Sequence, residues 1–166
     1  LQIISLSVYA LDGIAFSSEI LVGEAIGQKR VQSFKKIVRS SLKLGFIFSS
    51  VIGIFFYLLG FFIVDLMTSL KSVRLICYEY IVWISLIPSI SVSSYVYDGI
   101  FLGAARGKEI RVAMTQSFAI FFICVIGLVP LMGNIGLWTS IVVFNAVRAL
   151  TLWAKIDRIE ASFSSD

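Results

Sequence analysis

The chain has 166 residues, of which 58% are hydrophobic and only 14% are charged, with 14 Lys and Arg against 10 Asp and Glu. Soluble domains carry about 25% charged residues, so this composition excludes an ordinary soluble domain and favours an all-α, polytopic bundle of transmembrane helices. The sequence has no histidine, so any proton or cation chemistry must rest on carboxylates.

Five segments are predicted to cross a bilayer, because a spanning helix needs about 20 mostly apolar residues. They are residues 1–27, 42–64, 80–103, 111–131 and 135–154. The first carries Asp12, Glu19 and Glu24, and it can span if its carboxylates face away from lipid. Asp12 and Glu19 are seven residues apart, so they share one helix face with Tyr9 and Phe16.

The segment at residues 80–103 repeats this arrangement. Polar side chains recur on one of its faces at spacings of three, four and seven: Ser91, Ser94, Tyr95 and Asp98. Pro88 is expected to bend the outer half of this helix, because proline removes one helical hydrogen bond. Cys77 and Cys124 are expected to be free structural thiols.

The connections between the spans differ in charge. QKRVQSFKKIVRSSLK has six Lys or Arg and no acid, ARGKEIR has three Lys or Arg, and Lys155 and Arg158 follow the last span. The other two connections, DLMTSLKSVRLICYEY and MGNIG, are balanced or uncharged. Basic loops face the cytoplasm, so we expect a plasma (inner) membrane protein with its amino end outside and its carboxyl end inside. The expected partner is the lipid bilayer and not nucleic acid, and the polar tail DRIEASFSSD is expected to fray.

Carboxylates inside a membrane normally face the bundle interior or a wet cavity, and they mark functional sites. Two parallel helices that each present a carboxylate, a hydroxyl and a tyrosine predict a cavity that prefers cations. The predicted ion- or substrate-binding residues are Asp98, Asp12, Glu19, Tyr95 and Tyr9. The alternative is that Asp12 and Asp98 only hydrogen-bond neighbouring helices and hold the bundle together.

The triplet Asp-Gly-Ile occurs at residues 12–14 and again at residues 98–100. Each copy is followed by a pair of glycines with GxxxG spacing and then by a basic connection. Such spacing lets helix backbones approach closely, so Gly23, Gly27, Gly99 and Gly103 are predicted to pack helices. The repeat suggests an internal duplication, which is common in secondary transporters.

These motifs resemble a known family. SLSVYALDGIAFSSEILVGEAIGQKR resembles the eighth helix of the multidrug and toxic compound extrusion (MATE) family, in its DinF-like branch. YVYDGIFLGAARGKEIRVAM is similar to the tenth helix and its loop, and LVPLMGNIGLWTSIVVFNAVRALTLW to the eleventh and twelfth helices. The resemblance implies that residues 1–166 form one incomplete membrane domain, helices eight to twelve of a twelve-helix transporter. A fragment is also expected because Leu1 is not a methionine and no signal-peptide charges precede the apolar run.

The resemblance implies a secondary active antiporter that exports small organic, often cationic, compounds in exchange for protons or sodium ions. Such a protein is not an enzyme and has no catalytic residues, no cofactor and no metal beyond a possible sodium ion. In sodium-coupled relatives the acid of the tenth helix belongs to a cation site, and Asp98 holds that position here. The N-terminal lobe and the seventh helix, with its partner acid, would complete the transporter.

Two other hypotheses remain. Two close aspartates can share a proton and activate water, as in an intramembrane aspartyl protease. However, the sequence before Asp12 reads Tyr-Ala-Leu, not the Gly-x-Gly of those enzymes, and no Pro-Ala-Leu motif follows. The other possibility is an inert truncated fragment, since an incomplete lobe leaves polar groups unpaired in lipid.

Overall fold

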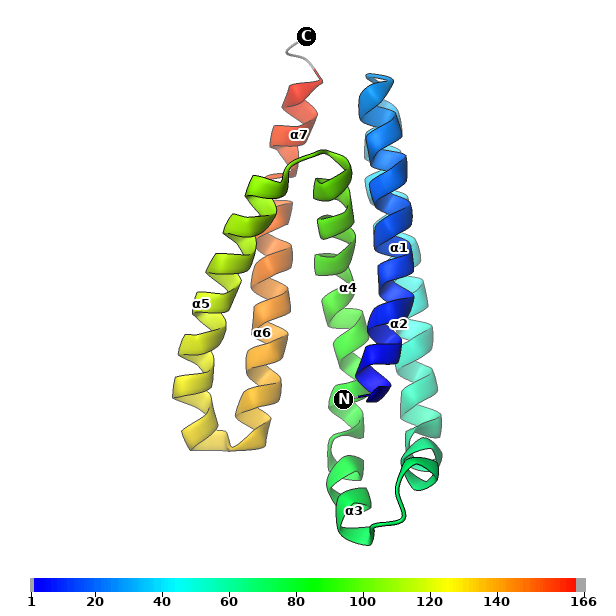
Figure 1. Cartoon of the computed structure of the whole chain (residues 1–166), viewed down its shortest axis with the longest axis vertical. Coiled ribbons are helices and arrows are strands. Elements are labelled where there is room, and N and C mark those ends of the chain that lie inside the picture. The colour runs from blue at the N-terminus through cyan, green and yellow to red at the C-terminus, as the bar shows by residue number, and fades with distance from the viewer. Residues whose placement is uncertain (1, 164–166) are drawn as a thin grey trace.

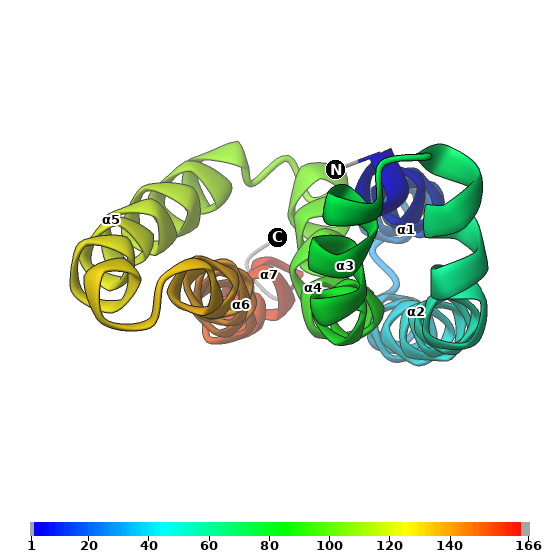
Figure 2. The same cartoon turned by 90° about the horizontal axis from the view of Figure 1, so that it is seen from below.

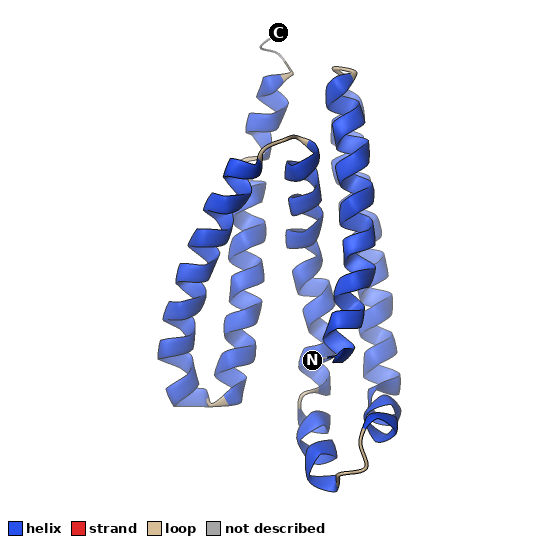
Figure 3. Ribbon diagram, in the orientation of Figure 1, coloured by secondary structure: helices blue, strands red, loops and turns tan. Residues whose placement is uncertain are grey.

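The computed structural model describes residues 2–163, and the predicted start of the first span at residue 1 lies outside this range. Within the range all regular structure is helical, which confirms the predicted class (Figure 3). The helices are α1 (Gln2–Gly27), α2 (Val31–Met67), α3 (Lys71–Glu79), α4 (Ile81–Gly103), α5 (Gly107–Met132), α6 (Asn134–Trp153) and α7 (Ile156–Ser162).

The long helices run up and down beside one another. α4 lies between two groups, α1 with α2 on one side and the α5–α6 hairpin on the other (Figures 1 and 2). α1, α4 and α6 run in one direction, and α2 and α5 run in the other (Figure 1). The two helices that carry the Asp-Gly-Ile triplets are therefore parallel, as predicted.

Helix α2 is longer than the predicted span. It begins at Val31, whereas the sequence pattern placed its start at residue 42 and treated residues 28–43 as a connection. Lysine and arginine are good helix formers, so the basic stretch continues the helix instead of interrupting it. At about 1.5 Å per residue the helix is about 55 Å long, against a hydrocarbon core of about 30 Å. Its basic first turns therefore extend beyond the apolar part.

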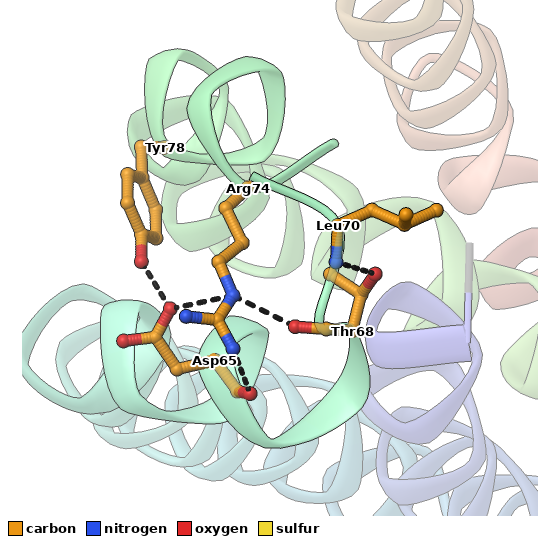
Figure 4. A network of polar contacts seen from close by, with 5 residues as sticks. All are labelled: Asp65, Thr68, Leu70, Arg74 and Tyr78. Carbon is orange, nitrogen blue, oxygen red and sulfur yellow. Dashed lines mark hydrogen bonds and ion pairs between the residues drawn. The ribbon is translucent and has the colours of Figure 1, made fainter. Parts of the chain in front are cut away.

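The stretch predicted as a plain connection between α2 and α4 contains the short helix α3. Arg74 fixes the turn before it: its Nε donates to the Thr68 carbonyl at 2.7 Å and lies 3.2 Å from Asp65 Oδ1 (Figure 4). The Tyr78 hydroxyl donates to the same Asp65 oxygen, and this hydrogen bond raises the pKa of Tyr78. Tyr78 also packs on Phe61, with ring centroids 4.9 Å apart. Partners on both sides of the turn explain why the segment is ordered.

The main buried cluster joins α1, α2 and α4 with the ends of α5 and α6 and with α7. Its largest members, all fully buried, are Phe34, Phe101, Leu11, Ile100, Leu152 and Ile159. The tail is therefore not frayed over residues 156–162: it forms α7, which buries Ile159 and pairs Glu160 with Lys35 at 2.8 Å. Ile156 and Ile159 are three residues apart, so they lie on one face of this short helix and pack into the core, although the segment is polar on average.

Within the part of the chain that the structure describes, four helical segments are long and apolar enough to cross a membrane: α2, α4, α5 and the stretch from Asn134 to Ala161. α1 has a similar length and is comparably apolar on average although it carries three carboxylates, and it packs against α2 and α4. These helices together with α1 are roughly consistent with the five predicted spans. α5 is the most exposed of the four, because only 11% of its most apolar stretch is buried inside the structure. It turns into α6 at Gly133, whose φ of 58° favours glycine.

Candidate functional site

The site begins with a close contact between the backbones of α1 and α4. A Cβ added at Gly99 would collide with the backbone carbonyl group of Ala15, and one at Gly103 with that of Glu19. Glycines spaced four residues apart on one helix allow such an approach. The contact aligns the acidic face of α1 with the acidic face of α4.

The glycines of α1 contribute less than the sequence pattern predicted. A Cβ at Gly23 would lie 3.5 Å from the Gly103 carbonyl oxygen, an ordinary contact. Gly27 departs from the prediction, because within the described structure nothing lies within 4 Å of its Cβ position. Gly27 is the last residue of α1 and precedes the exposed turn to α2, so α4 does not pack against it.

A cavity of about 220 Å³ opens beside this contact. α1 contributes residues at spacings of three, four and seven, α4 contributes residues with the same spacings, and α6 contributes one residue. The lining residues are Asp12, Ala15, Phe16 and Glu19 from α1, Tyr95, Asp98, Gly99 and Leu102 from α4, and Arg148 from α6. Four residues singled out from the sequence, Asp12, Glu19, Tyr95 and Asp98, are thus brought together.

Tyr9 is not brought to this cavity. It lies one turn before Asp12 on α1, and 71% of its side chain is exposed. Among the described residues of α1, the cavity lining begins at Asp12, one turn after Tyr9. Phe16, from the same stripe, does line the cavity although 64% of its side chain is exposed.

Asp98 is held by an arginine. Arg148 Nε donates to Asp98 Oδ1 at 3.2 Å, and Arg148 Nη2 forms an ion pair with Asp98 Oδ2. The side chains are 15% and 14% exposed for Arg148 and Asp98, so water has little access to the pair. Two parallel contacts between a guanidinium and a carboxylate give a bidentate ion pair, the strongest common type.

The sequence-based prediction of the site did not include Arg148. It considered basic residues only in the connections, whereas Arg148 lies inside the apolar segment at residues 135–154. An isolated arginine in the middle of a predicted span is itself a signal of function, because it needs a buried partner. That rule, applied to every span and not only to the carboxylates, would have identified it.

A second polar contact links α4 and α6 one turn away. The Ser94 hydroxyl lies 3.1 Å from Asn145 Oδ1 and 2.7 Å from the Ser91 carbonyl oxygen, and Ser94 and Asn145 are both buried. Asn145 Nδ2 donates to the Ile141 carbonyl on its own helix at 3.0 Å. The contact fixes the register of α6 on α4 and thereby carries Arg148 to Asp98.

The charges around the cavity do not cancel. Asp12, Glu19 and Asp98 line it against the single cation Arg148, which leaves two net negative charges when all four are ionised. Of the ion pairs that the structure describes, one involves Asp98 and none involves Asp12 or Glu19. Among the described residues, no group of three or more acidic or thiol side chains could hold a metal ion. The cavity is therefore cation-attracting, with its free negative charge on α1.

Two other cavities, each of about 350 Å³, are larger but carry less charge. One lies between α2 and α4 and is lined by residues such as Gly53, Tyr57, Ser85 and Ser89. The other lies between α1 and α2, where serines and apolar residues surround Lys36. Neither contains a carboxylate, so neither has the chemistry that intramembrane acids give to the smaller cavity.

Comparison with known proteins gives three similarities. The sequence model of the MatE family matches residues 1–131. The DNA damage-inducible protein F of Escherichia coli (strain K12) is 31% identical over 154 residues, which are 93% of this chain and 33% of that protein. A solved structure described as the inward-facing conformation of a multidrug resistance MATE family transporter of the MOP superfamily superposes with a TM-score of 0.79 at 20% identity. That superposition covers 99% of this chain and 39% of the solved one. The chain thus spans about a third of the length of the curated relative.

Proposed function

We propose, because this chain belongs to the MatE family, that it forms part of a secondary active antiporter that exports small organic, often cationic, compounds. Export would be driven by inward movement of protons or sodium ions. The chain is part of an integral membrane protein, and its fold matches part of a multidrug transporter. The N-terminal lobe and the seventh helix would supply the opposite wall of the transport pathway.

The observation that supports this proposal is the acidic cavity between α1 and α4. Three carboxylates line one hollow in helices that are otherwise apolar. A carboxylate can be neutralised either by binding a proton or by pairing with a cation. A cation and a proton therefore compete for the same groups, which is the thermodynamic requirement for exchanging one for the other.

The lining also suits the charged end of an organic cation. Phe16 and Tyr95 place aromatic rings at the rim and wall of the cavity, and Asp12 and Glu19 supply the negative charge. Cations are attracted to aromatic faces within about 6 Å of the ring centroid. A volume of about 220 Å³ accommodates a head group, while the rest of a drug-sized molecule would lie in the part of the pathway that other helices form.

The geometry argues against the protease hypothesis. Sharing of one proton between two aspartates requires that both present a free oxygen to it. Both oxygens of Asp98 instead contact Arg148, so Asp98 is not available to activate water with Asp12. The proposed activity is transport without covalent chemistry.

The test is efflux of ethidium, a fluorescent aromatic cation, from bacterial cells that express the intact protein. Asp12→Asn and Glu19→Gln are each expected to reduce the efflux rate by about tenfold, which corresponds to about 1.4 kcal/mol of lost interaction with the cation. Asp98→Asn is expected to reduce it as well, because it leaves Arg148 in the cavity as an unpaired positive charge.

The matched control is Glu24→Gln. Glu24 lies on the same helix but is exposed, outside the cavity, and hydrogen-bonded to Gln28. Its neutralisation should leave ethidium efflux unchanged. Normal efflux in the Asp12→Asn and Glu19→Gln variants, at normal membrane abundance, would remove the α1 carboxylates from the transport mechanism.

A further inference from the structure

Asp98 is the position at which a sodium ion was expected, but its carboxylate already forms an ion pair with Arg148. Each of its two oxygens contacts a different nitrogen of Arg148. Sodium needs several oxygen ligands around it. Asp12 and Glu19 line the same cavity, but the Asp98 oxygens that a sodium ion would need are both occupied by Arg148. With Arg148 in place, the residues present therefore do not fit a sodium site at Asp98.

Physical chemistry favours the arginine over a free sodium ion at this carboxylate. The guanidinium is anchored to α6, so it meets Asp98 at the high effective concentration of a tethered group. It is less strongly hydrated than a compact cation, and its planar fork matches both carboxylate oxygens. A sodium ion would have to lose water and also leave Arg148 as an unpaired charge that is 15% exposed.

Holding α6 in place does not by itself require this ion pair. The Ser94–Asn145 contact already links α4 and α6 one turn away, and it uses no charge. Arg148 also lines the cavity, as do Asp12 and Glu19, so its charge acts on whatever enters. An arginine at this place neutralises the α4 wall and leaves the α1 wall acidic.

We propose that Arg148 is the resident counter-ion of Asp98, that it excludes sodium from this carboxylate, and that the cationic end of the substrate is consequently held by Asp12 and Glu19. The proposal rests on the proposed export function only for its last clause. The exclusion of sodium is a property of the ion pair and holds whether or not the protein exports drugs.

The experiment is equilibrium binding of radioactive sodium to the purified intact protein by scintillation proximity. The quantity compared is Asp98-dependent binding, defined as the binding lost when Asp98→Asn is added to a given chain. In the unmodified protein we expect no Asp98-dependent binding. In Arg148→Gln, where the carboxylate loses its counter-ion, we expect saturable binding that Asp98→Asn abolishes.

Arg111→Gln is the matched control, because Arg111 is an exposed arginine on α5 outside the cavity. It should gain no sodium binding. Asp98-dependent binding in the unmodified protein would overturn the proposal, and this comparison does not depend on whether Arg148→Gln folds. A well-folded Arg148→Gln chain without Asp98-dependent binding would also overturn it.

Failure of the proposed export function can be distinguished from failure of the proposal for Arg148. If cells expressing the unmodified protein expel no ethidium, the proposed function fails, while the sodium measurements still decide the role of Arg148. If ethidium is expelled but sodium binds at Asp98 in the unmodified protein, the function survives and the assignment of Arg148 does not.

Discussion

Two polar side chains within the apolar helix α6, those of Asn145 and Arg148, have a partner on α4. Asn145 contacts Ser94, and Arg148 pairs with Asp98 one turn further along. Lipid is as apolar as leucine, so apolar side chains give little drive for one helix to prefer another, and polar contacts select the partner and the register. The uncharged Asn145–Ser94 contact therefore sets the register of α6 on α4, and that register brings Arg148 to Asp98.

A first prediction concerns Asn145, whose amide is buried at this interface. Asn145→Ala should destabilise the intact protein by about 0.6–2 kcal/mol, the range found for interhelical hydrogen bonds in membranes. Ser94 keeps its hydrogen bond to the Ser91 carbonyl, so no buried group is left unpaired. The check is the thermal unfolding midpoint of the detergent-solubilised protein.

Ser140→Ala serves as its control, since Ser140 is also buried on α6 but donates to the Gly136 carbonyl of its own helix at 2.7 Å. It should change the midpoint less than Asn145→Ala does. A double-mutant cycle with Ser94→Ala isolates the contact between helices. A coupling energy of zero in that cycle would show that the contact contributes nothing.

Some residues of the site could be predicted from their neighbours in the sequence, and one of their contacts could not. Asp12, Glu19, Tyr95 and Asp98 could be found because each interrupts an apolar run on one helix face. The pairing of Asp98 with Arg148 joins positions 50 residues apart on different helices. The spacing of residues within one helix cannot predict that contact, because the contact depends on how α6 packs against α4.

Between elements, the contact of α1 with α4 depends on glycines of α4 and on the backbone of α1. The two helices share an acidic cavity only because their axes come close at Gly99 and Gly103. A larger residue there would push the acidic walls apart. Packing and the proposed binding are therefore coupled at this interface.

Gly103→Ala tests this coupling. The added Cβ would collide with the carbonyl group of Glu19, backbone that has no flexible end to move aside. Overpacking of this kind costs about 1–3 kcal/mol, so we expect a lower unfolding midpoint and weaker ethidium efflux. Unfolding is followed by the thermal midpoint, and efflux by ethidium fluorescence in cells.

Gly27→Ala is the matched control, because it makes the same chemical change on α1 where the described structure has open space. It should be neutral or slightly stabilising, since alanine is favoured over glycine in helices by about 1 kcal/mol. Equal losses in the two variants would show that close contact at Gly103 does not explain the effect, because helix propensity alone predicts a gain from Gly→Ala.

Helix boundaries were the weakest part of the sequence-based prediction, for a physical reason. Hydropathy marks where lipid can surround a helix, not where helical hydrogen bonding ends. α2 therefore begins at Val31, well before its apolar part, and α7 forms in a tail that is polar on average. The order of the long helices and the parallel sense of α1 and α4 followed from apolar length and loop charge alone.

Taken as a whole, the molecule has two chemically different ends. The turn after α1, the turn after α4 and helix α7 lie at one end, and helix α3 and the turn between α5 and α6 lie at the other (Figure 1). The first end carries the basic stretches, including Lys29, Arg30 and Arg106. Positively charged loops are retained in the cytoplasm. We therefore expect the end with α7 to face the cytoplasm and the end with α3 to face outside.

Labelling of single cysteines with a membrane-impermeant maleimide tests this orientation in intact cells. Cys77→Ser and Cys124→Ser first remove the native thiols. In that background Ser69→Cys, in the exposed link between α2 and α3, should react from outside, whereas Gln28→Cys, in the exposed turn after α1, should not.

Permeabilised cells supply the control, since there the Gln28→Cys chain must react as well if its thiol is accessible. The reverse labelling pattern in intact cells would show that the end with α7 faces outside and the end with α3 faces the cytoplasm. It would also turn the predicted direction of export around, because α1 and α4 carry the acidic cavity and both run from the α3 end toward the α7 end. The orientation of the charges therefore bears directly on which side of the membrane loads the cavity in each half of the proposed cycle.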